Sequence, residues 1–102
     1  MKNINFNPGK IVYNEFCVDF SKPFKEQLDN LLEDLLQVEF FNGYLLDLGW
    51  YPEYDEEGEF VIRVIKDQDW ESPVYKKKCK DEDQLFHNLE MAIKIVRSYN
   101  NK

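Results

Sequence analysis

Two eight-residue stretches with strand-like patterns, separated by a short acidic turn, constrain the fold of this chain most strongly. In YLLDLGWY, residues 44–51, every second position from Tyr44 to Trp50 is a large apolar residue. EFVIRVIK, residues 59–66, is apolar on both sides of an extended chain. Pro52 and Gly58 in the intervening PEYDEEG are typical of turns. This pattern predicts an antiparallel hairpin whose second strand is central in a sheet.

Two further strands are predicted at the edges of that sheet. IVYNEFCV, residues 11–18, is rich in β-branched and aromatic residues and follows the turn signal NPGK. VYKKKC, residues 74–79, carries consecutive lysines, which suit an edge strand because they oppose pairing with another chain.

Two amphipathic helices are predicted, one before the central hairpin in the sequence and one after the last strand. The first has Ser21 as a cap and Pro23 in its first turn, and ends near Gly43. Its apolar positions follow the helical period: Phe24, Leu28, Leu31, Leu32 and Leu35. The second helix begins at DEDQ, residues 81–84, which resembles a capping box. Its apolar stripe consists of Leu85, Leu89, Ala92, Ile93 and Val96.

The predicted fold is therefore α+β, in the order β-α-β-β-β-α. Three to four antiparallel strands would form the sheet, and both helices would pack on one face of it. With 102 residues and 43% hydrophobic residues, the chain is expected to form a single domain over residues 1–102.

The negative charge of the chain is concentrated in one segment. Residues 47–71 hold nine acidic and two basic residues, and the remaining residues hold eleven of each, so this segment carries the whole net charge of −7. Phosphate backbones and anionic membranes repel such a chain, so direct binding of nucleic acid or membrane is not expected. A basic protein surface would instead be attracted to it.

The sequence favours a cytoplasmic location. No apolar run is long enough to cross a bilayer, and the N-terminal segment MKNINFNPGK lacks the apolar region of a signal peptide. Cys17 and Cys79 are therefore expected to be reduced, partly buried thiols.

Catalytic and metal-binding motifs are not evident. The single histidine, His87, is expected on the surface of the second helix, and one histidine with two distant cysteines is too few for a zinc site. We therefore predict no catalytic residue, no metal and no cofactor. Weak divalent-cation binding by the loop acids, or hydrolysis by paired carboxylates, stay as alternatives.

Aromatic residues among the loop acids give the strongest functional signal. Trp50 continues an apolar strand face and could be core, but Tyr54 and Trp70 each stand mid-loop among charged neighbours. Tyrosine and tryptophan are frequent anchors in protein interfaces, and rings beside carboxylates suit lysine and arginine. The alternative is that the rings are core and the acids only solvate the loops. The predicted partner-binding residues are Glu53, Tyr54, Asp55, Glu56, Glu57, Asp67, Asp69 and Trp70.

GYLLDLGWYPEYDEEGEFVIRVIKDQDWESP, residues 43–73, with LEMAIKIV, residues 89–96, resembles small bacterial immunity proteins. These proteins guard a cell against polymorphic or contact-dependent growth-inhibition toxins. The likeness rests on the Trp-Tyr-Pro hairpin, the Gly-x-Phe-Val-Ile strand, the WESP turn and the closing helix. It implies a non-enzymatic antitoxin that binds a cognate toxin, often a basic nuclease, and blocks its active site.

One other protein-binding function stays open, and one nucleic-acid-binding function is rejected. The same acidic and aromatic residues would suit an adaptor or regulatory subunit that docks a basic intracellular protein. The element order over residues 21–97 is also that of double-stranded-RNA-binding domains, but the motif residues and the sign of the charge do not fit that function. Oligomeric state is left open, as is strand addition at a sheet edge.

Overall fold

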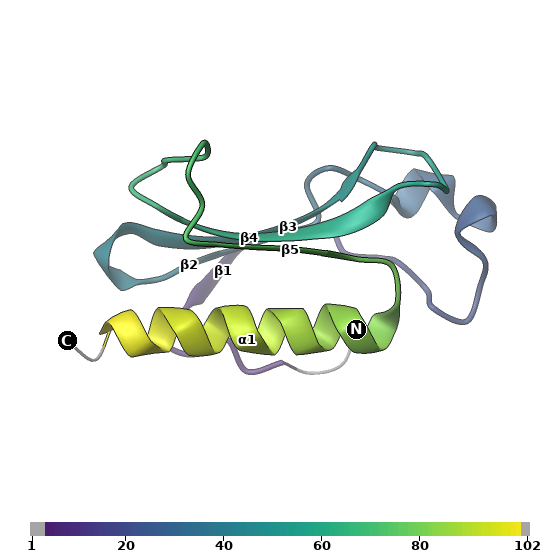
Figure 1. Ribbon diagram of the computed structural model, residues 1–102. Helices are drawn as coiled ribbons and strands as arrows, with labels where there is room; N and C mark the ends of the chain where they lie inside the picture. The colour runs from purple at the N-terminus through teal and green to yellow at the C-terminus, as the bar shows by residue number, and fades with distance from the viewer. Residues whose placement is uncertain (1–3, 101–102) are drawn as a thin grey trace.

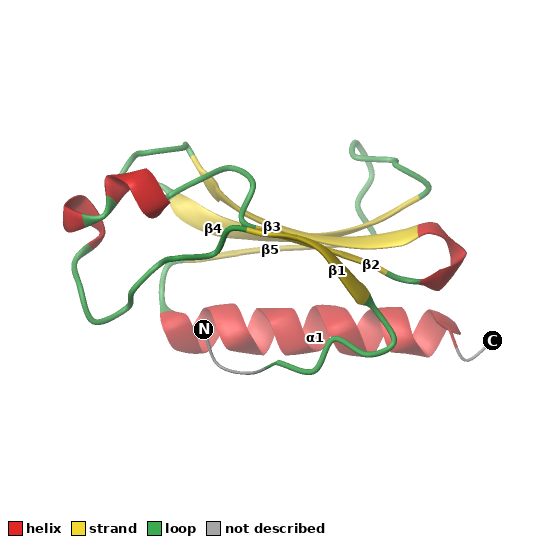
Figure 2. Ribbon diagram, turned by 180° about the vertical axis from the view of Figure 1, so that it is seen from behind, coloured by secondary structure: helices red, strands yellow, loops and turns green. Residues whose placement is uncertain are grey.

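The computed structural model describes residues 4–100, which form a five-stranded antiparallel sheet with one long helix on one face (Figures 1 and 2). The strands lie in sequence order across the sheet: β1 (Lys10–Asn14), β2 (Leu36–Glu39), β3 (Tyr44–Tyr51), β4 (Glu59–Lys66) and β5 (Tyr75–Cys79). The helix is α1 (Glu82–Asn100). The α+β class is confirmed, but the predicted order β-α-β-β-β-α is wrong, as are the second helix and the three to four strands.

The central hairpin is confirmed with the predicted bounds. β3 and β4 pair along their whole length, from Tyr44 opposite Lys66 to Tyr51 opposite Glu59. Leu46, Leu48 and Trp50 are fully buried on the side that α1 covers. β4 lies between β3 and β5, so it is an inner strand, but β3 and not β4 is the middle strand of the five. The two predicted edge strands are both at edges, as β1 and β5, but β1 ends at Asn14 and not at Val18 as predicted.

The helix predicted over residues 21–43 does not form. That stretch contains the short 3-10 turns η1 (Phe24–Glu26) and η2 (Leu28–Asn30), an extended segment, strand β2, and a third 3-10 turn, η3 (Phe41–Gly43). β2 pairs with both β1 and β3. A helix here would leave one edge of β3 unpaired, and the backbone groups of a strand edge need partners.

A buried glutamine organises the segment where the helix was expected to start. The Gln27 side chain donates from Nε2 to the carbonyls of Asp19 and Lys22 at 2.7 and 3.1 Å. Its Oε1 accepts from the Asp19 backbone N–H at 2.8 Å. The Ser21 hydroxyl, expected to cap a helix, instead donates to Asp19 Oδ1 at 2.6 Å. These bonds satisfy the turn locally, so the chain gains nothing by continuing as a helix.

An aromatic cluster closes the end of the sheet next to these turns. Phe24 packs against Trp50 with ring centroids 4.7 Å apart, and Trp50 meets Phe60 edge-on at 4.9 Å. Phe16 and Phe20 extend the cluster over Phe60. Residues 15–30 therefore contribute apolar rings to the core without forming an α-helix or a strand.

Helix α1 follows the sequence prediction. The Asp81 carboxylate accepts from the Gln84 backbone N–H at 2.7 Å, as an N-cap does. The predicted apolar stripe is buried against the sheet. Residues 4–9 run beside the helix, where Arg97 donates to the carbonyls of Asn7 and Asn5 at 2.7 and 3.0 Å (Figure 2). Among the described residues, no helix has the length and apolar character needed to span a membrane.

The two cysteines are free, and they differ in environment. Cys79 is buried, and burial raises the pKa of its thiol. Cys17 is exposed, so the expectation of a partly buried thiol is wrong for it. Its carbonyl, not its sulfur, takes part in the turn network by accepting from Asn30 Nδ2 at 3.2 Å.

Gly49 allows the chain before β2 to bulge over β3 while it stays paired with that strand. The Leu35 N–H donates to Leu48 O at 3.0 Å, and the Trp50 N–H donates to Leu32 O at 2.8 Å. Between these two bonds the chain bulges, and the Glu33 carbonyl lies where a Cβ on residue 49 would be. Because the obstacle is backbone, it cannot move aside as a flexible side chain would.

We predict that Gly49→Ala lowers the free energy of unfolding by about 2 kcal/mol, because the bulge at Glu33 must shift to admit the methyl group. Lys77→Ala, at an exposed position on β5, is the control and should change it by less than about 0.5 kcal/mol. Urea unfolding of the three proteins checks this. Equal stability of Gly49→Ala and the parent would contradict the close approach of the Glu33 carbonyl to Gly49.

Candidate functional site

Helix α1 covers one face of the sheet, and two loops rise from opposite ends of the other face (Figures 1 and 2). We call this the open face. The register places Gln37, Asp47, Arg63 and Lys76 in one row across it. One loop, residues 52–58, joins β3 to β4, and the other, residues 67–74, joins β4 to β5. An eight-residue strand separates them, which corresponds to about 26 Å.

The structure divides the predicted binding residues between these two loops. The first, which we call the hairpin tip, holds Glu53, Tyr54, Asp55, Glu56 and Glu57. The second, which we call the Trp70 loop, holds Asp67, Asp69 and Trp70. The predicted residues therefore form two separate groups that project on the same side of the sheet (Figure 1).

The hairpin tip is anchored to the core while its tyrosine faces outward. The buried Trp50 donates from Nε1 to Asp55 O at 2.8 Å, and the Tyr54 N–H donates to Leu31 O at 2.8 Å. Tyr54 itself is 54% exposed and has a φ of 62°. A bulky residue seldom adopts positive φ, and such residues concentrate at functional sites. Trp50 is core, as one of the two alternatives expected.

Sequence reasoning missed an acid that joins the hairpin tip from residues 31–35. The Glu33 N–H donates to Glu53 Oε1 at 3.2 Å, which fixes this segment beside the tip. Glu33 is exposed. As part of a helix it would have been an ordinary solvent-facing residue. Only the pairing of this segment with β3 brings its charge to the tip.

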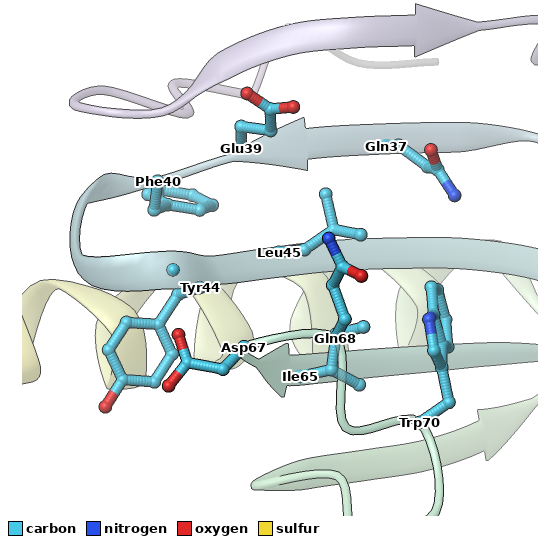
Figure 3. A pocket seen from close by; sticks show the side chains of 10 residues that line it. Gln37, Glu39, Phe40, Tyr44, Leu45, Ile65, Asp67, Gln68 and Trp70 are labelled. Carbon is cyan, nitrogen blue, oxygen red and sulfur yellow. The ribbon is translucent and has the colours of Figure 1, made fainter.

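The Trp70 loop begins with a tight turn. Asp67 and Gln68 have φ angles of 52° and 62°, and the Asp69 N–H donates to Lys66 O at 3.0 Å. The Asp67 N–H donates to Gly43 O at 2.9 Å, so the loop is also bonded to the β2–β3 turn. Trp70 is 45% exposed, and its ring lies over the sheet beside Gln68 (Figure 3).

A pocket of about 520 Å³ lies between this loop and the open face (Figure 3). Its floor includes Leu45 and Ile65, which are opposite each other on β3 and β4. Glu39, Asp67 and Trp70 are among the residues around it. Glu39 lies opposite Leu45 on β2, so this carboxylate reaches the pocket only because β2 is a strand.

A buried carboxylate occupies the middle of the open face. Asp47 is 2% exposed, and its Oδ1 accepts from Gln37 Nε2 at 3.0 Å. Arg63 lies 3.8 Å from Asp47 Oδ2, and its guanidinium stands over the Tyr51 ring at 5.1 Å. Burial raises the pKa of Asp47, and the Gln37 hydrogen bond and Arg63 charge oppose this only in part. Asp47 is therefore a structural residue and adds little to the external field.

Within residues 4–100 there is no group of three or more histidine, cysteine or acidic residues that could hold a metal ion. Comparison of the chain with protein-family models, with curated proteins and with solved structures finds no match.

The raised pKa of Asp47 predicts a pH-dependent effect of Asp47→Asn. Because the folded-state pKa is above the unfolded value of about 3.9, the carboxyl contributes stability below that value, which is lost as pH rises through the folded-state pKa. The asparagine variant has no such loss. Its free energy of unfolding relative to the parent should therefore increase from pH 4 to pH 7, as measured by urea unfolding at both pH values.

Val61→Ala is the matched control for this measurement, because Val61 is buried on the same face and does not titrate. Its difference from the parent should be the same at both pH values. A pH-independent difference for Asp47→Asn would contradict the raised pKa.

Proposed function

We propose that this protein is a binding module that captures a basic protein on the open face of its sheet. The observation that carries the proposal is that Tyr54 and Trp70, both about half exposed, belong to two acidic loops that rise on the same side of the sheet. The hairpin tip and the Trp70 loop would contact the partner at two separated places. The sheet between them would hold the two regions at a fixed spacing.

The two kinds of side chain have different roles in this proposal. The exposed acids attract a cationic surface at long range and raise the rate of association. The rings supply contact area at low entropic cost, and they favour the lysine and arginine side chains that the acids attract. Glu33 beside the hairpin tip and Glu39 beside the Trp70 loop strengthen the local charge at each place.

We further propose that the basic partner is a toxin domain and that this chain is its immunity protein, acting in the cytoplasm without catalysis. The likeness of residues 43–96 to such proteins supports this choice over an adaptor subunit. An inhibitor of a nuclease has to compete with nucleic acid, and clustered carboxylates can occupy sites that bind phosphates. Fast electrostatic capture also suits a protein that has to intercept an incoming toxin.

Purification of the tagged chain from its own cells, followed by identification of the bound protein, tests this proposal. The expected partner is basic, arrests growth when expressed alone, and is harmless when this chain is co-expressed. A partner that is harmless alone would contradict the immunity function and favour the adaptor function. A partner with no basic surface would contradict the electrostatic proposal as a whole.

Charge reversal of the hairpin tip should weaken capture of that partner. We predict that the triple variant Asp55→Lys, Glu56→Lys and Glu57→Lys folds normally and associates at least about tenfold more slowly at low salt. The difference should shrink in 0.5 M salt, where screening is strong. Surface plasmon resonance with the purified partner at two salt concentrations measures this.

The control variant has the same change in net charge at exposed acids outside the hairpin tip and the Trp70 loop: Glu15→Lys, Asp83→Lys and Glu90→Lys. This variant should keep most of the association rate. If both triple variants lose the same amount, net charge alone governs association and the hairpin tip has no special part in it.

A further inference from the structure

We propose that the pocket beneath Trp70 receives an arginine side chain of the partner. This inference rests on the proposed function, because it assumes a basic protein on the open face. It goes beyond that function by naming one residue type and the place where it binds.

The lining of the pocket suits a flat, partly apolar side chain. The Trp70 ring stands on one side of it, and Leu45 and Ile65 form an apolar floor (Figure 3). Its volume of about 520 Å³ is within the range of ligand-binding pockets. The methylene groups of an arginine could lie on the floor while the guanidinium stacks against the indole.

The charged side chains that line the pocket are acidic. Glu39 and Asp67 contribute carboxylates, and among the described residues neither forms an ion pair. None of the lysines and arginines that the structure describes lines the pocket. Lys66, which neighbours Asp67 in the chain, places its ammonium over the Tyr44 ring at 5.2 Å. A cation from outside would therefore meet free carboxylates.

The open face already contains the arrangement that we propose. Arg63 lies with its guanidinium over the Tyr51 ring at 5.1 Å and 3.8 Å from the Asp47 carboxylate. Around the pocket, Trp70 supplies a ring and Glu39 and Asp67 supply carboxylates farther along it, without a guanidinium between them. Arginine fits better than lysine, because a planar guanidinium can stack on a ring and donate two parallel hydrogen bonds to a carboxylate.

The pocket is formed before any ligand arrives. Asp67 and Gln68 are both held at positive φ, and the Asp67 N–H is bonded to Gly43 O. Gly43 has a φ of 81°, and a Cβ there would strike the Asp67 carboxylate, so the two turns fit only with glycine at this position. A preformed loop reduces the entropy lost when a side chain binds.

The test uses short capped peptides and needs no natural partner. The probe is acetyl-Gly-Arg-Gly-amide, titrated into 15N-labelled protein while the two indole N–H resonances are followed by NMR. Trp70→Phe identifies the Trp70 signal. We expect the Trp70 resonance to move with a Kd on the order of millimolar, and the Trp50 resonance, bonded to Asp55 O, to stay. The neutral citrulline peptide and the lysine peptide should each bind about tenfold more weakly.

Variants distinguish the pocket from general attraction to an acidic protein. Glu39→Gln and Asp67→Asn should each weaken binding of the arginine peptide severalfold. Glu71→Gln removes an exposed acid of the same loop that does not line the pocket, and it should have little effect. An unmoved Trp70 resonance, an equal response to citrulline or lysine, or an equal loss in Glu71→Gln would each overturn the assignment.

The outcome separates this inference from the proposed function. Peptide binding at Trp70, with a natural partner that lacks a basic surface, would support the pocket and contradict the proposed function. Capture of a basic partner, with no peptide response and an unchanged dissociation rate in Trp70→Ala, would overturn the pocket and leave the proposed function standing.

Discussion

Burial of β3 and β4 on both of their faces is the constraint on which the rest of the structure depends. Leu46 and Leu48 are buried beneath α1, while Asp47 and Gly49 are buried on the opposite side, which α1 does not cover. On β4, Val61 and Ile65 are likewise 2% and 1% exposed on the open face. The chain therefore has to close this face with irregular segments.

Those closing segments also carry the candidate binding residues. At one end, the Glu33 carbonyl lies over Gly49, and the Glu33 N–H donates to Glu53 in the hairpin tip. At the other end, the loop that holds Trp70 lies over Ile65. Each closure is held from below by backbone hydrogen bonds, so its outer side chains are free to be charged or aromatic. In this account, the same loops that complete the core present the acids and rings to a partner.

The elements whose sequence pattern fits only one type of secondary structure could be predicted. The eight-residue alternation of β3 and the five apolar positions of α1 each fit a single period, and turn residues mark their ends. The leucines between residues 28 and 36 fit a helical stripe, yet Leu36, Val38 and Phe40 also alternate as in a strand. Only pairing with β1 and β3 decides between the two, and such non-local pairing is not visible in the local sequence.

The candidate site was predictable to the same extent. The residues of both tips could be identified because proline, glycine and charged residues mark them as loops. The two loops lie at opposite ends of β4 because one precedes and the other follows that strand, and the length of the strand sets their separation. The contributions of Glu33 and Glu39 could not be predicted, because both depend on β2. Burial of Asp47 also depends on register, since its partners Gln37 and Arg63 come from the two neighbouring strands.

The central claim is that the open face, and not the helical face, meets a basic partner. Cross-saturation NMR on the complex with the protein that co-purifies with this chain tests it most directly. The account predicts saturation transfer to residues 53–57 of the hairpin tip and 67–71 of the Trp70 loop, and to none on the outward side of α1. Transfer confined to exposed helix residues such as His87, Glu90 and Lys94 would contradict it.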